Sequence, residues 1–106
     1  MATGRLGALD LAATTNTTLY TCPSSTFAIA SVSFCNRGSS TVTVRLAMAS
    51  SATPSDSEYL EYEAAIAPKG VLERTGIVID AGKLLVVRAS ATSVSAVAYG
   101  IETSTV

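Results

Sequence analysis

The sequence predicts an all-β fold: a single β-sandwich or jelly-roll-like domain of seven to eight antiparallel strands with a short N-terminal arm. Three observations support this prediction. Apolar residues recur at every second position rather than at helical spacing. Turn signals separate these segments at intervals of roughly ten residues. No change in composition along the 106 residues marks a second domain. We therefore expect one domain over residues 1–106, with residues 1–11 as its arm.

The first predicted elements are the arm and a short strand. Gly4 and Gly7 lie close together near the N-terminus and indicate a flexible segment. Thr17–Cys22 predicts a short strand that Pro23 ends, because proline has no N–H to donate to a β-ladder.

Thr26–Asn36 predicts a buried strand whose register the sequence leaves open, because apolar residues fall on both faces. Phe27 and Ile29 share one face, whereas Val32 and Phe34 share the other.

The next two segments alternate more regularly. Thr41–Met48 is the clearest predicted strand of the chain, and its apolar, core-facing side is formed by Val42, Val44, Leu46 and Met48. Its wetter face comprises Thr43, Arg45 and Ala47. Residues 59–64 predict the next strand. Leu60, Tyr62 and Ala64 form one face, and Tyr59, Glu61 and Glu63 form the other, with the acidic residues pointing outward.

Three further strands complete the prediction. In Val71–Ile79 the apolar positions change face, as a β-bulge at Gly76 would produce. Lys83–Ser90 contains the longest aliphatic run. Val94–Ile101 closes the chain, and the residues sharing one of its faces are Val97, Tyr99 and Ile101.

Turn-forming residues separate these strands. Pro68–Gly70 fits a type II turn with Gly70 at the position of positive φ. Asp80–Gly82 fits a type I turn that closes a hairpin, with its glycine in the left-handed region. Residues 36–40 form a loop, and Ser50–Ser57 is the longest loop.

Composition excludes several classes of function. The net charge is -1 and only 14% of the residues are charged, so there is no basic patch for nucleic acid. Histidine is absent, which removes the commonest general base and metal ligand. No segment has the roughly 20 apolar residues of a membrane-spanning helix. Residues 1–10 lack the apolar region of a secretory signal, so we expect folding in the cytoplasm.

The two cysteines are expected to be free thiols in that reducing compartment, with a disulfide as the alternative. Cys35 follows Phe34 in a strand-like run and is interpreted as a small buried apolar residue, whereas Cys22 precedes a proline.

No motif in the sequence identifies a catalytic residue, a cofactor-binding residue or a metal site. The densest charge comprises Asp56, Glu58, Glu61 and Glu63. Paired carboxylates could hydrolyse glycosides and several oxygens could bind Ca²⁺. Glu61 and Glu63, however, are two residues apart on one predicted strand face. We therefore interpret the group as a solvated face that discourages edge-to-edge pairing.

The tyrosines and the cations are the remaining candidates. Tyr20, Tyr59, Tyr62 and Tyr99 could form a sugar-stacking platform, although amphipathic packing in separate strands is the simpler interpretation. Three arginines could pair with carboxylates, either across an interface or within the chain: Arg45, Arg74 and Arg88. Lys69 and Lys83 are expected to be solvated at turns.

In the order of its predicted strands and of several short sequence segments, the chain resembles a group of small β-sandwich virion proteins of tailed bacteriophages. The resemblance covers nearly the whole chain and contains no active-site motif. It rests on Thr18–Pro23, Cys35–Arg37, Thr41–Ala47, Tyr59–Tyr62, Leu72–Val78, Asp80–Gly82 and Val97–Glu102.

The resemblance implies a non-enzymatic virion structural protein, assembled in the cytoplasm of the bacterial host. The expected role is that of a capsid decoration (cement) protein, which binds the major capsid protein across capsomer junctions. The alternatives are a tail, neck, baseplate or fibre component, or a carbohydrate- or receptor-binding module. The surplus of apolar residues also predicts a homo-oligomer, either a trimer or a dimer. Residues 1–11 and Ser50–Ser57 are the expected contact segments, since arms and loops can become ordered on a partner.

Overall fold

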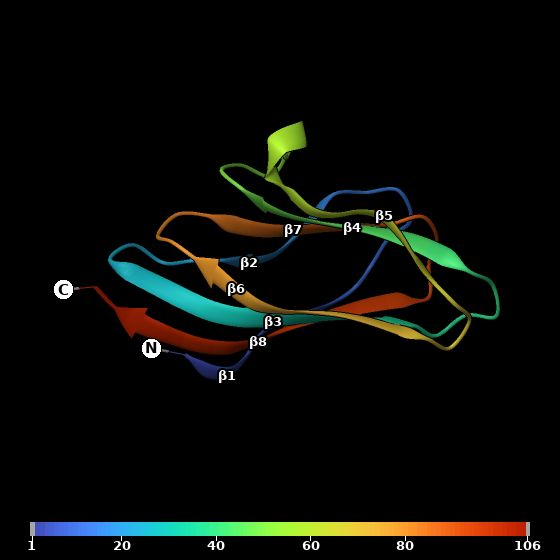
Figure 1. Ribbon diagram of the computed structural model, residues 1–106, viewed down its shortest axis with the longest axis horizontal. Helices are drawn as coiled ribbons and strands as arrows, with labels where there is room; N and C mark the ends of the chain where they lie inside the picture. Colours follow the sequence, from blue (N-terminus) through green and yellow to red (C-terminus); the bar gives the residue numbers. More distant parts are fainter. Residues whose placement is uncertain (1, 106) are drawn as a thin grey trace.

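Eight strands form two four-stranded antiparallel sheets packed face to face in a computed structural model that describes residues 2–105 (Figure 1), which confirms the predicted sandwich. The first sheet has the order β1 (Thr3–Asp10), β8 (Val94–Ser104), β3 (Thr26–Asn36), β6 (Val71–Ile79). The second has the order β2 (Thr17–Thr21), β7 (Leu84–Ala89), β4 (Val42–Ala49), β5 (Tyr59–Ile66). A single 3₁₀ turn, η1 (Asp56–Glu58), precedes β5. Within this described part of the chain, no helix is long and apolar enough to cross a bilayer.

The connections follow a jelly roll, because only the link between β4 and β5 stays within one sheet. The predicted hairpin at Asp80–Gly82 is therefore wrong: Gly82 has φ +82°, as expected, but the turn leads from β6 in the first sheet to β7 in the second. The turn before β6 also differs in detail. Lys69, not Gly70, takes the positive φ (61°), while the N–H of Gly70 donates to the carbonyl of Ala67 at 2.9 Å.

The core lies between the sheets and resolves the register of β3. Every even-numbered residue from Thr26 to Asn36 is buried, so Val32 and Phe34 face the second sheet. They pack in one cluster with Val44 and Leu46 of β4. A fully buried side chain of this kind stabilises the fold by about 1.5–3 kcal/mol. Phe27 and Ile29 consequently point away from the core.

The structure corrects the expectation of a flexible arm at residues 1–11. Residues 3–10 form β1, which pairs with β8 along its length, while Met1 lies outside the described residues. Leu6 and Leu9 pack against the core, and Leu11 is buried, so apolar burial outweighs the freedom of the neighbouring glycines. Gly7 instead permits a close approach, because a Cβ there would lie 2.3 Å from the carbonyl oxygen of Leu19.

The predicted β-bulge in β6 is confirmed. Gly76 has φ +71°, and the register of β6 against β3 shifts between Ala30 and Val32. Beyond the bulge Ile77 points into the core, and Val78 is therefore exposed on the outer surface. The bulge thus explains why the apolar positions change face along this strand.

A carboxylate connects the two sheets near the chain ends. The hydroxyl of Tyr20 in β2 donates to Glu102 in β8, and the N–H of Ala2 donates to the same carboxylate at 2.9 Å. Burial, together with the hydrogen bond to Glu102, raises the pKa of the Tyr20 hydroxyl. The hydrogen bonds from Tyr20 and Ala2 lower the pKa of Glu102 below its ordinary value of 4.5.

We expect the Glu102 carboxylate to make the stability of the fold sensitive to acid. Because the pKa of Glu102 is lowered in the folded protein, its ionised form stabilises the fold above pH 4.5, and that contribution is lost as the pH falls through the lowered pKa. Urea-unfolding midpoints measured from about pH 6 to about pH 3 should therefore fall less steeply for Glu102→Gln than for the wild type. Tyr20→Phe removes the donating hydroxyl and should flatten the profile in the same direction. Identical slopes in all three proteins would contradict this role.

Candidate functional site

The outer surface of the first sheet carries a row of exposed apolar side chains. Ile101, Ile29 and Val78 lie opposite one another on the adjacent strands β8, β3 and β6. They are 45%, 43% and 57% exposed, respectively. Side chains paired in this way lie about 4.5–5.5 Å apart at their Cβ atoms, so the row is continuous. We call the surface made by this row and its neighbours the apolar face: Phe27, Ile29, Val78, Val97, Tyr99 and Ile101.

Charged residues of opposite sign border the apolar face. Arg5 in the edge strand β1 lies opposite Tyr99 and has no ion-pair partner among residues 2–105. Glu73 in the other edge strand, β6, accepts a hydrogen bond from the Tyr99 hydroxyl, and this bond raises the pKa of the tyrosine. The apolar face therefore has a free cation on one side and a carboxylate on the other.

A second candidate surface, on the outer side of the other sheet, brings two tyrosines together. The rings of Tyr59 and Tyr62 meet edge to face, with centroids 5.0 Å apart and planes at 78°. The guanidinium carbon of Arg45 lies 4.4 Å from the centroid of the Tyr62 ring. The Nε of Arg45 donates a hydrogen bond to the carboxylate of Glu63 at 2.5 Å, and this hydrogen bond raises the pKa of Arg45.

This grouping corrects the predicted alternation of β5. Tyr62 was expected on the same face as Leu60 and Ala64, which do pack against the core. The structure instead leaves Tyr62 59% exposed, since Glu63 takes a positive φ (52°) and the register against β4 shifts at this point. A bulge with a non-glycine residue in the left-handed region has no clear sequence signal.

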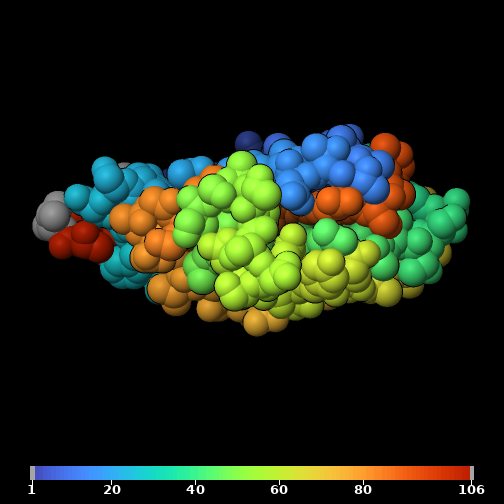
Figure 2. Space-filling model, turned by 90° about the horizontal axis from the view of Figure 1, so that it is seen from above, coloured from blue at the N-terminus to red at the C-terminus, as the bar shows by residue number. Residues whose placement is uncertain are grey.

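The loop at residues 50–57 adds a carboxylate to the two tyrosines. It folds back over the outer surface of the second sheet, where its atoms cover the middle of that face (Figures 1 and 2). Beneath it Ala47 and Val86, which pair with each other across β4 and β7, are buried. Asp56 at the start of η1 then lines a surface depression of about 460 Å³ together with Tyr59 and Tyr62. We call Arg45, Asp56, Tyr59 and Tyr62 the tyrosine patch.

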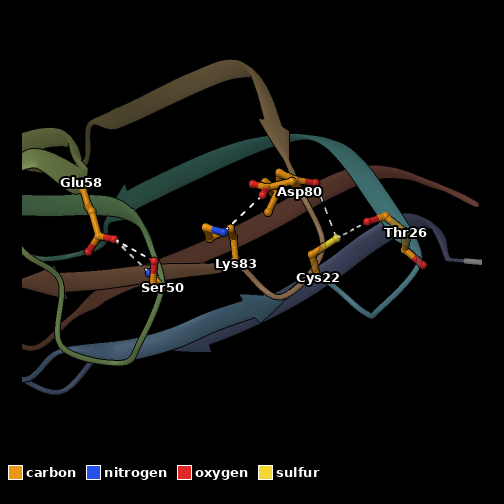
Figure 3. A network of polar contacts seen from close by, with 7 residues as sticks. Cys22, Thr26, Ser50, Glu58, Asp80 and Lys83 are labelled. Carbon is orange, nitrogen blue, oxygen red and sulfur yellow. Dashed lines mark hydrogen bonds and ion pairs between the residues drawn. The ribbon is translucent and has the colours of Figure 1, made fainter. Parts of the chain in front are cut away.

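The conformation of this loop is fixed by Glu58. Its carboxylate accepts a hydrogen bond from the N–H of Ser55 at 2.9 Å. It also accepts one from the N–H of Ser50 at 3.1 Å, which Figure 3 shows. The bonds from these backbone groups lower the pKa of Glu58. The expected contact segment Ser50–Ser57 is therefore held in place within the chain itself.

The acidic residues do not form the continuous solvated face that the sequence predicted. Glu61 pairs with Arg74 at 2.8 Å and so connects β5 to β6 in the other sheet, whereas Glu63 pairs with Arg45. The first of the two register shifts between β4 and β5, between Val44 and Leu46, separates them. Only Asp56 of this acidic group has neither an ion pair nor a hydrogen-bond partner within residues 2–105. Those residues contain no group of three or more His, Cys, Asp or Glu side chains placed to hold a metal ion.

The remaining candidate cations lie apart from each other. Arg88 points outward beside Arg45, its register partner in β4, and makes no ion pair with a described residue. Lys83 pairs with Asp80 at 3.2 Å (Figure 3). The ammonium of Lys69 donates to the carbonyl of Arg37 at 2.8 Å.

Both cysteines are free, as predicted. The Cys22 thiol is buried within 3.4 Å of the carbonyl oxygen of Thr26 (Figure 3), and burial raises its pKa. Cys35 is only half-buried, contrary to expectation, because odd-numbered residues of β3 point outward. The two thiols lie at opposite ends of β3, roughly 30 Å apart at the usual rise per residue.

Comparisons of the chain with protein-family models, with curated protein sequences and with solved structures returned no match.

Proposed function

We propose that this chain is a non-enzymatic structural protein of a tailed-bacteriophage virion, specifically a capsid decoration (cement) protein that binds the outer shell across capsomer junctions. The sequence segments that resemble small virion proteins of tailed bacteriophages support the proposed class of protein. The apolar face is the observation that carries the proposal, since exposed apolar side chains gathered in one row are typical of a surface that becomes buried on assembly.

The occupant of the apolar face is a second copy of the chain. A twofold axis parallel to the strands, between β8 and β3, stacks Ile101 of one copy on Ile29 of the other, so the row is self-complementary. The same axis brings Arg5 of one copy over β6 of the other, about 7 Å along the strand from Glu73. An arginine side chain spans that distance. Both copies direct the same end of the sandwich toward the shell.

Such a dimer stabilises a shell through mass action. A ligand that binds only the assembled state stabilises it by about 2.7 kcal/mol when its free concentration is 100 times Kd. Two shell contacts on one dimer add avidity without any new contact surface.

Two measurements test this function. Light scattering should give the mass of a dimer, and co-sedimentation with empty capsids should show saturable binding that raises their melting temperature. A strict monomer that ignores capsids would contradict the proposal. A particle reconstruction that places the chain only in the tail would reject the decoration role while leaving the dimer intact.

A charge exchange tests the geometry of the dimer. Arg5→Glu should weaken self-association about tenfold or more, because it sets two carboxylates against each other across the interface. Glu73→Arg should do the same, whereas the double variant Arg5→Glu/Glu73→Arg should recover most of the affinity. Additive losses in the double variant would show that the two residues do not meet. The dimer constants can be measured by analytical ultracentrifugation.

A further inference from the structure

The tyrosine patch lies on the sheet opposite the apolar face and is built to hold an aromatic ring in a fixed position. Arg45 covers one side of Tyr62 at 4.4 Å, and Tyr59 meets the ring edge to face at 5.0 Å. Arg45 is itself fixed by Glu63. Tyr62 nevertheless remains 59% exposed, which leaves a rigid aromatic surface open to a ligand. A ring that is ordered before binding loses little conformational entropy when it binds.

The polar groups around this ring define the class of ligand. Asp56 lines the same depression and has no ion-pair partner in the described chain, so its carboxylate can accept two hydrogen bonds. The nearby charges largely offset one another, with the carboxylates of Asp56, Glu58 and Glu63 opposed by Arg45 and Arg88. A strongly charged ligand therefore gains little, and the depression is too open to enclose an apolar one.

We propose that the tyrosine patch binds a neutral pyranose unit of a glycan. The face of the Tyr62 ring that Arg45 does not cover attracts the C–H groups on one side of the sugar ring. Two adjacent hydroxyls of the sugar donate to the Asp56 carboxylate. The chain thereby carries a glycan-binding site that is independent of its self-association, because the two surfaces belong to different sheets.

The test is a titration of the full-length ¹⁵N-labelled protein with the methyl glycosides of glucose, galactose, mannose and N-acetylglucosamine, followed by NMR. At least one glycoside should shift the amide signals around Tyr59, Tyr62 and Asp56 in a saturable manner. Tyr62→Ala should weaken that binding at least tenfold, whereas Tyr62→Phe keeps the ring and should stay within about threefold. Asp56→Ala should also weaken binding.

Val71→Ala is the control, because Val71 is a large exposed side chain on the other sheet that belongs to neither the tyrosine patch nor the apolar face, and its loss should leave sugar binding unchanged. The proposal is overturned if none of the four glycosides shifts the patch. It is equally overturned if Tyr62→Ala binds as well as the wild type, or if the shifts lie around Tyr99. Since the readout is sugar binding to the isolated protein, a failure of capsid binding does not affect it.

Discussion

Replacing Ile29 by aspartate is expected to abolish self-association, with at least a 100-fold loss of affinity. Ile29 lies at the centre of the apolar row, between Ile101 and Val78. An unpaired carboxylate buried at that point costs several kcal/mol, and each 1.4 kcal/mol is a factor of ten in affinity. The isolated fold should tolerate the change because the side chain is 43% exposed. Light scattering gives the oligomeric state, and circular dichroism verifies that the variant is folded.

Val71→Asp provides the matched control for this variant. Val71 is also a large exposed apolar residue of the first sheet, at 62%, but it pairs with Cys35 near the other end of β3. That position is about 20 Å from Ile29 along the strand. The proposed axis places it over Asp10 in β1 of the other copy, at the border of the interface, so the control should lose much less affinity than Ile29→Asp. Equal losses from both substitutions would indicate a general effect of added charge, and no loss from Ile29→Asp would exclude the apolar face as the interface.

Asn36→Ala is expected to lower the free energy of unfolding by about 2–4 kcal/mol. Asn36 is fully buried at the end of β3, and its side-chain amide N–H groups donate to the carbonyls of Ser40 at 2.8 Å and of Ile66 and Ala67 at 3.2 Å. Its side-chain oxygen accepts from the N–H of Gly38 at 3.0 Å. Truncation leaves buried backbone groups without partners at the point where β3 meets the turn after β5.

Asn36→Asp separates the donor from the acceptor in this network. It keeps the oxygen that faces Gly38 but turns another oxygen toward three carbonyls, so it should destabilise the protein at least as much as Asn36→Ala at neutral pH. Urea unfolding followed by circular dichroism gives both free energies. A change below about 0.5 kcal/mol in Asn36→Ala would show that water replaces the lost bonds.

The sequence was informative wherever local rules decide the structure. Alternation located seven strands, and the glycine in β6 marked its bulge, because the period of two and the preference of glycine for positive φ act over a few residues. The strand at residues 3–10 was missed for the opposite reason. Its partner, β8, lies at the other end of the chain, so nothing within the segment itself indicates pairing.

The candidate surfaces depended on features that no local rule contains. The apolar row joins residues 29, 78 and 101, which come together only through the order of strands in the sheet. Tyr59 and Tyr62 share a face because Glu63 occupies a left-handed conformation that its residue type rarely adopts. Asn36 looked like part of a loop, although its buried amide links three segments.

The position of β8 has a consequence for biosynthesis. Of the eight strands it is the last in chain order, yet it lies inside the first sheet, between β1 and β3 (Figure 1). At about 5–20 residues per second the ribosome needs several seconds to pass from β1 to the end of β8, and until then β1 has no neighbour in its sheet. Its unpaired backbone can meet the same strand of another nascent chain on a crowded polysome. Slower translation of the codons for β8 should therefore lower the soluble yield of this protein more than slower translation of the other strands.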